Sequence, residues 1–208
     1  MKNIWYVSYG SNILEERFLC YIRGGKPKGI DKTYSGCRDK SLPLASEELY
    51  ISGELYFAKK SITWKNKGVA FLSNSSQEKQ TKAKMYLISK EQFLDVIKQE
   101  NKADIEINID FLEVEKNGSV IIEGIKWYNK VVLLGEKDGN LMLTFTHEND
   151  EFLKAINCPD ESYLKIIMEG LKESFNCNEF DLLEYFEDLN GIKNYFSKEK
   201  LIELAKEI

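Results

Sequence analysis

The chain has 208 residues, of which 43% are hydrophobic, 12% aromatic and 30% charged, a composition typical of a globular protein with a well-supplied core. Its net charge is −5, and its lysines and arginines are scattered among acidic residues, so it lacks the basic stripe that nucleic-acid binding requires. No apolar run approaches the roughly 20 residues of a membrane span and the N-terminus lacks a signal-peptide pattern, so we expect a cytoplasmic protein with neither nucleic-acid nor membrane partners.

The cysteines and the single histidine bear on metal binding and nucleophilic catalysis. Four cysteines lie far apart without a Cys-x-x-Cys pair, which argues against a zinc site and against a disulfide scaffold. Zinc hydrolases usually need two or three histidines, so a zinc-dependent deacetylase is disfavoured, and a Ser-His-Asp arrangement would have to use His147. We expect reduced thiols, a surface or capping role for His147, and neither metal nor cofactor.

The first element predicted is a strand that runs into a small polar turn. Residues 4–7 are β-branched or aromatic, as in a buried strand. Gly10 lets backbone amides approach a ligand, and Ser11 or Asn12 can cap a helix beginning near Ile13. Because the first N–H groups of a helix are unpaired, this turn is typical of an anion-binding site. The apolar face of the helix comprises Leu14, Phe18 and Ile22.

Strands dominate the middle of the chain. After a loop over 34–44 that we expect to fold over the site, strands are predicted at 49–58, 68–72 and 81–88, the last with one face on the core. Ser89 and Gln92 predict a capping box for a helix ending near 99–101. Further strands are predicted at 105–114, 120–127, 130–134 and 141–146, the last two joined by the Asp138-Gly139 turn.

From Glu148 onward the apolar spacing is helical, with breaks at 158–159, 176–178 and 190–191. Strands in the first two thirds and helices in the last third predict an α+β fold, a mixed sheet or closed barrel flanked by helices. We expect one domain over 1–208, with a core at 1–175 and a helical tail at 176–208.

Three separated segments resemble the gamma-glutamylcyclotransferase-like family. Residues 9–12, Tyr-Gly-Ser-Asn, resemble its opening motif. The strand 85–88 and the helix ending at Gln99-Glu100 are similar to the segment that carries the family's catalytic glutamate, although Asn101 replaces a glycine. Both residue types accept a left-handed backbone, so the turn can survive the exchange. Residues 159–173 resemble a helix opening with Pro-x-x-Tyr, with one extra residue before Tyr163.

The resemblance implies a mixed sheet closing into a small β-barrel flanked by helices, and an enzyme that needs no cofactor. Its reaction would cyclise the γ-glutamyl group of a small molecule to 5-oxoproline and release an amine or amino acid, with Glu100 as general acid and base. Such a base is best buried among apolar residues, for which Phe93 and Ile97 are the expected neighbours. The residues implied in substrate binding are Tyr9, Gly10, Ser11, Asn12, Ile13 and Tyr163.

Two other functions remain open at this point. The same glutamate could activate water in a related amide hydrolase or deacylase, which would act on substrates without a free α-amine. The fold could also serve a non-catalytic protein that binds a small metabolite or a partner, because fold does not fix function. The sequence does not choose between a monomer and a homodimer.

Overall fold

The structure is a computed structural model that describes residues 2–27, 32–73, 78–148 and 155–208. Its elements in chain order are β1 (Asn3–Ser8), η1 (Ser11–Ile13), α1 (Glu15–Arg23), β2 (Ser46–Ser52), β3 (Glu54–Ser61), η2 (Ile62–Trp64), β4 (Lys67–Ser73), β5 (Gln80–Ser89), α2 (Lys90–Asn101), α3 (Phe111–Asn117), β6 (Ser119–Ile121), β7 (Lys130–Lys137), β8 (Asn140–Thr146), α4 (Glu161–Phe175), α5 (Glu179–Phe186) and α6 (Lys198–Lys206). The chain divides into two compact units. Unit 1 comprises 1–8, 16–47 and 84–148, and unit 2 comprises 9–15, 48–83 and 149–208.

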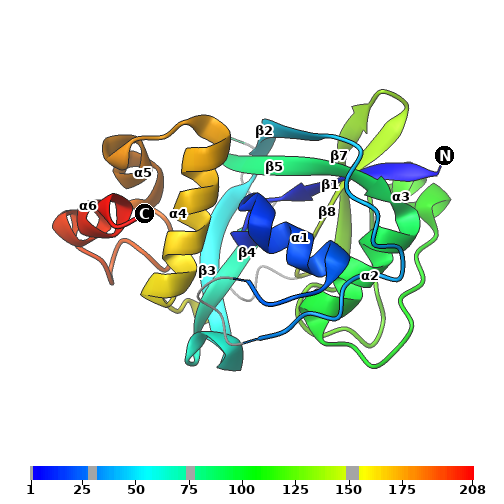
Figure 1. Cartoon of the computed structure of the whole chain (residues 1–208), viewed down its shortest axis with the longest axis horizontal. Helices are drawn as coiled ribbons and strands as arrows, with labels where there is room; N and C mark the ends of the chain where they lie inside the picture. The colour runs from blue at the N-terminus through cyan, green and yellow to red at the C-terminus, as the bar shows by residue number, and fades with distance from the viewer. Residues whose placement is uncertain (1, 28–31, 74–77, 149–154) are drawn as a thin grey trace. The chain divides into compact units, whose positions relative to one another are not determined.

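Unit 1 is built on a sheet with β1 and β8 at its centre. The six-stranded sheet has the order β2-β5-β1-β8-β7-β6, with β1 antiparallel to β5 and parallel to β8. Helices α1 and α2 cover one face of this sheet (Figure 1). Tyr6 of β1 lies in the core between them, with ring centroids 5.4 Å from Phe18 and 5.9 Å from Phe93. Burial of large aromatic rings on this face therefore joins both helices to the sheet.

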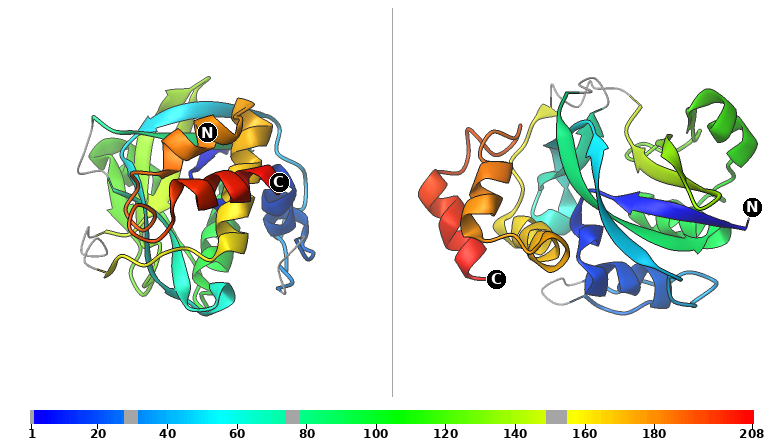
Figure 2. Two further views of the ribbon diagram at one scale, coloured as in Figure 1. Left: turned by 90° about the vertical axis from the view of Figure 1, so that its left-hand side faces the viewer. Right: turned by 90° about the horizontal axis from the view of Figure 1, so that it is seen from above.

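Unit 2 contains a two-stranded sheet and the C-terminal helices. β3 and β4 pair in antiparallel register from Glu54 opposite Ser73 to Ser61 opposite Lys67, with a bulge between Ala58 and Ser61. Helix α4 buries an apolar stripe, and α5 and α6 pack against each other (Figure 2). The two helices of the predicted tail are thus present, whereas the division of the chain at residue 175 stays a prediction.

The predicted α+β class is confirmed, but the predicted barrel is wrong. Among the described residues no sheet closes, since β2 and β6 are the edges of one sheet and β3 and β4 form the other. The strand predicted over 49–58 is divided at Gly53, whose φ of +127° only glycine adopts readily. This turn places β2 and β3 in different sheets.

Two further strand predictions fail, the first of them where local capping favours a helix. The alternating isoleucines of 105–109 do not form a strand. Asp110 instead accepts hydrogen bonds from the backbone N–H groups of Leu112 and Glu113 and caps α3, which ends at Gly118 with φ +76°. The strand predicted over 120–127 is reduced to β6.

Strand β5 is buried on both faces, which the predicted one-sided alternation missed. Lys84 is 7% exposed and Tyr86 is fully buried, while Ala83 and Met85 are buried as well. The side chain of Tyr86 stacks on Phe18 of α1 at 4.1 Å, so the helix covers the face predicted to be polar.

Several local predictions are confirmed. Ser89 and Gln92 form the capping box of α2, with the Gln92 N–H donating to Ser89 Oγ at 3.1 Å. Asp138 and Gly139 both have positive φ in the turn between β7 and β8. Leu153, predicted to be helical, lies outside the described residues, and Ile156 forms a bridge with Ala58 rather than a helix.

A search of the described residues finds no helix with the length and apolarity that crossing a membrane requires.

Candidate functional site

The turn after β1 is a single turn of 3-10 helix rather than the start of α1. Gly10 is its N-cap, and the Ile13 N–H donates to the Gly10 carbonyl at 3.0 Å. The backbone becomes extended at Leu14, and α1 begins at Glu15. Helix α1 therefore begins two residues later than the predicted start near Ile13, and the N-cap of the 3-10 turn is Gly10 rather than Ser11 or Asn12.

Helix α4 approaches this turn so closely that it leaves no room for side chains at two glycines. A Cβ atom on Gly170 would stand 2.5 Å from the Leu14 nitrogen and 2.9 Å from the Ile13 carbonyl carbon. A Cβ on Gly10 would stand 3.3 Å from Ala70 Cβ and 3.6 Å from the Tyr163 hydroxyl. Backbone contact between α4 and the turn thus fixes the position of residues 10–14.

Tyr163 is held at the same place by β4 and by aromatic rings. Its buried hydroxyl accepts a hydrogen bond from the Ala70 N–H at 3.3 Å. Its ring lies 4.7 Å from Trp64 and makes an edge contact with Phe57 at 6.4 Å. The rings of Trp64 and Phe57 therefore orient this tyrosine.

Within unit 2 the structure places Tyr163 beside the turn, and the role of both in substrate binding stays a prediction. We call the residues Tyr9, Gly10, Ser11, Asn12 and Ile13 the Gly10 loop. Apart from Gly10, which is partly exposed, they are buried. The loop is therefore a rigid piece of backbone rather than a mobile surface turn.

Glu100 belongs to unit 1 and lies half-buried in the last turn of α2. Asn101 is still helical, and Lys102 adopts the left-handed conformation at φ +50°, so the prediction of a left-handed turn at Asn101 is displaced by one residue. The Asn101 side chain instead accepts the Tyr128 N–H at 2.9 Å and donates to the Tyr128 and Ile97 carbonyls. This amide anchors the end of α2 beside Glu100.

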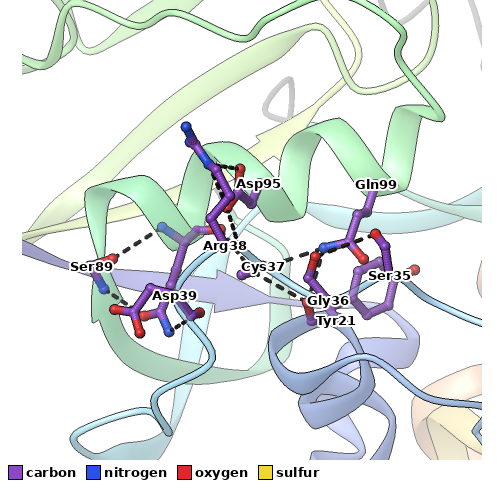
Figure 3. Close-up of polar contacts among 10 residues, drawn as sticks. Tyr21, Ser35, Gly36, Cys37, Arg38, Asp39, Ser89, Asp95 and Gln99 are labelled. Atoms are coloured by element: carbon purple, nitrogen blue, oxygen red, sulfur yellow. Dashed lines mark hydrogen bonds and ion pairs between the residues drawn. The ribbon is translucent and has the colours of Figure 1, made fainter.

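Glu100 interacts with charged and hydroxyl side chains that the sequence analysis did not include among its neighbours. Phe93 and Ile97 are buried in the core, whereas Glu100 interacts electrostatically with Tyr21, Tyr34 and Lys32. The link between α2 and α1 is direct, because Gln99 Nε2 donates to the Tyr21 carbonyl at 3.0 Å (Figure 3). We call Arg17, Tyr21, Lys32 and Tyr34 the tyrosine cluster.

Hydrogen bonds join the tyrosine cluster. Arg17 Nη2 donates to the Tyr34 hydroxyl at 3.1 Å, and the Tyr21 hydroxyl donates to the same oxygen at 3.2 Å. The Arg17 guanidinium lies over both rings, 5.8 Å from Tyr21 and 5.7 Å from Tyr34. The Lys32 ammonium lies 4.1 Å from the centroid of the Tyr34 ring.

Electrostatics keep the two phenols protonated. Burial raises the pKa of Tyr21 well above its usual value, and the Glu100 carboxylate adds to this effect. Burial also raises the pKa of Tyr34, against the opposing charge of Arg17, and it lowers the pKa of Lys32, against the opposing charge of Glu100. Both hydroxyls are therefore hydrogen-bond donors at neutral pH.

The cluster was missed because its members come from separate segments. Arg17 and Tyr21 are four residues apart on α1, a spacing that does predict a shared helix face. Tyr34 joins them through a loop: its N–H and carbonyl both pair with Gly25, at 2.8 and 3.0 Å. No local pattern in the sequence indicates that pairing.

A groove of about 710 Å³ runs along α2 in the same unit and is lined by charges of both signs. Arg38 donates to Asp95 through Nε at 3.0 Å and through its backbone N–H at 2.9 Å (Figure 3). Beneath this pair lies Cys37, whose pKa is raised to about 12 by burial and by the nearby carboxylates of Asp95 and Asp39. Among the described residues, no set of three or more histidine, cysteine or acidic side chains is arranged to hold a metal ion.

Comparisons with known proteins point to one fold. No family model matches the chain. The chain is 32% identical over 186 residues, 82% of its length, to histone deacetylase 5 of Arabidopsis thaliana, but it spans only 28% of that protein. A solved gamma-glutamyl cyclotransferase, 20% identical, matches with a TM-score of 0.50 over the whole of both chains. An uncharacterized protein from Homo sapiens matches equally well, with 20% identity and a TM-score of 0.50 over 98% of this chain and 99% of that one.

Proposed function

We propose that this chain, which has the fold of a gamma-glutamyl cyclotransferase, cyclises a γ-glutamyl group to 5-oxoproline and releases an amine or amino acid. The observation that carries the proposal is a carboxylate, Glu100, at the end of α2 in a chain that shares this fold over its whole length. The name of the plant relative describes a protein of which the chain spans 28%, so it adds nothing on the reaction.

In the proposed reaction the α-amine of the γ-glutamyl group attacks its own γ-carbonyl. Because the nucleophile is tethered to the electrophile, folding of the substrate into a reactive shape supplies much of the rate. The α-ammonium must first lose a proton, and the leaving nitrogen must gain one. Glu100 would accept the first proton and donate it to the departing amine.

The Gly10 loop would supply the second part of the mechanism. Backbone N–H groups stabilise the charge that develops on a carbonyl oxygen when they are held rigidly before the reaction begins. The loop is held in this way by α4, and the Tyr163 hydroxyl stands beside Gly10. Loop amides would bind the oxyanion of the γ-carbonyl or the α-carboxylate, and the hydroxyls of Tyr163 and Tyr9 would complete the pocket.

The test is formation of 5-oxoproline by purified protein from a panel of γ-glutamyl amino acids, γ-glutamyl amines and glutathione, followed by mass spectrometry. Glu100→Gln keeps the size of the side chain and removes the base, and we expect it to lower kcat by about 10²- to 10⁴-fold. Glu91→Gln, at the exposed start of the same helix, is the matched control and is expected to retain activity. Product from no member of the panel would contradict the proposal, and full activity of Glu100→Gln would exclude Glu100 as the base.

A further inference from the structure

Three aromatic rings of unit 2 surround the ammonium group of Lys82 on β5. Its nitrogen lies 5.1 Å from the ring centroid of Tyr50, 5.6 Å from that of Phe175 and 5.3 Å from that of Tyr185. We call Lys82 and these three rings the aromatic cage. A ring face attracts a cation, but no described residue accepts a hydrogen bond from this ammonium, which has three N–H donors. The aromatic cage therefore holds the charge and leaves the donors to solvent or to a ligand.

The aromatic cage lines a cavity of about 430 Å³ together with Cys177, Asp181 and Glu184, and all seven residues belong to unit 2. Pockets for small molecules measure about 300–1,000 Å³ and are lined mainly by apolar side chains with a few polar groups. Cys177 is 8% exposed and burial raises the pKa of its thiol, so it contributes a small apolar surface. The cavity shares no residue with the Gly10 loop or the tyrosine cluster. It is a separate concave site of the size that a small molecule fills.

Contacts within the aromatic cage hold its rings in place. The Tyr185 hydroxyl accepts a hydrogen bond from the backbone N–H of Lys82 at 3.2 Å, and the Tyr50 ring makes an edge contact with Phe175 at 5.4 Å. Tyr50 is nevertheless 57% exposed and the Lys82 side chain is only half-buried, so solvent reaches the cage. Walls that are held before a ligand arrives lose little freedom on binding, which is a property of recognition sites.

The charges at the cavity favour a ligand that carries both signs. Asp181 is already engaged, because its Oδ2 atom accepts the Asn178 N–H at 2.9 Å in the capping box of α5, where the helix N-terminus stabilises a negative charge. Glu184 is exposed, and no described residue forms an ion pair with it. An anion bound at Lys82 would be repelled by Glu184, and a cation bound at Glu184 would be repelled by Lys82. A ligand with one charge of each sign meets neither obstacle.

We propose that this cavity binds a free α-amino acid with an apolar side chain. The ligand carboxylate accepts hydrogen bonds from the Lys82 ammonium, the ligand ammonium pairs with Glu184, and the apolar side chain packs on the three rings. In an α-amino acid the two charged groups share one carbon, so the residues that bind them must line the same small cavity, as Lys82 and Glu184 do. The inference goes beyond the proposed function and does not depend on it, because binding at this cavity requires no reaction.

The experiment measures the heat of binding of three probes to the full chain. L-leucine carries both charges, L-leucinamide lacks the carboxylate, and N-acetyl-L-leucine lacks the ammonium. We expect L-leucinamide to bind about 10- to 100-fold more weakly than L-leucine, the equivalent of one charge-assisted hydrogen bond. N-acetyl-L-leucine is expected to bind about three- to tenfold more weakly than L-leucine, a smaller loss because Glu184 is exposed to solvent.

Variants at Lys82 assign the binding to this cavity. Lys82→Met removes the ammonium and keeps an unbranched side chain that contacts aromatic rings favourably. We expect it to weaken L-leucine about 10- to 100-fold and not to weaken L-leucinamide, which has no carboxylate for Lys82 to bind. Lys82→Arg keeps the charge and is expected to retain binding. Lys193→Met, at an exposed position in the same unit, is the matched control, and thermal denaturation confirms that each variant is folded.

The comparison of the three probes on the wild-type protein needs no variant, so it decides the question even if Lys82→Met does not fold. In that case Glu184→Gln, at an exposed residue, locates the site, and it is expected to weaken L-leucine about threefold without weakening N-acetyl-L-leucine. No heat with L-leucine, equal affinities for L-leucine and L-leucinamide, or unchanged binding of L-leucine by folded Lys82→Met would each overturn the inference and leave the proposed function untouched.

Discussion

The Gly10 loop and the tyrosine cluster are built on opposite principles. The loop owes its position to backbone contacts that glycine permits, as at Gly170, and its members are consecutive in the chain. The cluster owes its position to charged and hydroxyl side chains that come from α1 and from the segment 32–34. A site made of consecutive residues leaves a pattern in the sequence, whereas a site assembled from side chains that are far apart in the chain leaves none.

The largest effect on stability is expected from Gly170→Ala. Alanine is favoured over glycine in a helix by about 1 kcal/mol, but here its Cβ would meet the Leu14 nitrogen at 2.5 Å. Because that obstacle is backbone, we expect a net loss of about 1–3 kcal/mol in the free energy of unfolding, measured in urea, with a loss of activity. Glu169→Ala on the exposed surface of α4 is the control, and a stabilised Gly170→Ala protein would show that α4 does not fix the loop.

A smaller effect is expected from Tyr163→Phe, which separates the contribution of the hydroxyl from that of the ring. The contacts with Trp64 and Phe57 are kept, and the hydrogen bond from Ala70 is lost. We expect the free energy of unfolding to fall by about 1 kcal/mol. Tyr195→Phe, at a ring that is 53% exposed, is the control, and equal stability of the two variants would argue that the Ala70 bond contributes nothing.

The smallest effect is expected at Cys37, three residues after Tyr34, and is measured as a rate of chemical labelling. Burial raises the pKa of Cys37 to about 12, so at pH 8 only about one molecule in 10⁴ carries the reactive thiolate. Because the raised pKa favours the thiol, labelling by iodoacetamide should stay slow at pH 8 and rise tenfold per pH unit until the pH approaches 12. The Cys37 N–H bonds the Ile22 carbonyl at 2.9 Å, so fast labelling at pH 8 would mean that the segment carrying Tyr34 leaves α1. Cys20→Ser removes the signal of the more exposed Cys20 thiol.

Local chemistry explains which parts of the fold could be predicted. The capping box of α2 and the Asp138-Gly139 turn were read correctly because each depends on residues a few positions apart. The alternating isoleucines at 105–109 predicted a strand wrongly. The side chain of Asp110 caps a helix that begins at the next residue. The prediction of a barrel was wrong because the chain changes direction at Gly53, which has a positive φ. A sequence does not reveal which of its glycines will adopt such a conformation.

The candidate site divides in the same way. Motif resemblance singled out both Tyr163 and the Gly10 loop, although the turn proved to be a 3-10 helix. The polar surroundings of Glu100 could not be predicted, because Tyr34 reaches α1 only through its pairing with Gly25, a contact between residues with no shared pattern. Sequence reasoning thus identified the proposed base and missed the groups that surround it.

The most direct test of the central claim is the fate of oxygen when a γ-glutamyl substrate reacts in water enriched in ¹⁸O. Cyclisation uses no water, so the account predicts 5-oxoproline of unchanged mass in an amount equal to the amine released, at a rate that Glu100→Gln lowers by about 10²- to 10⁴-fold. Glutamate carrying one ¹⁸O atom would contradict it, because it would show that water attacks the γ-carbonyl and that the protein is an amide hydrolase.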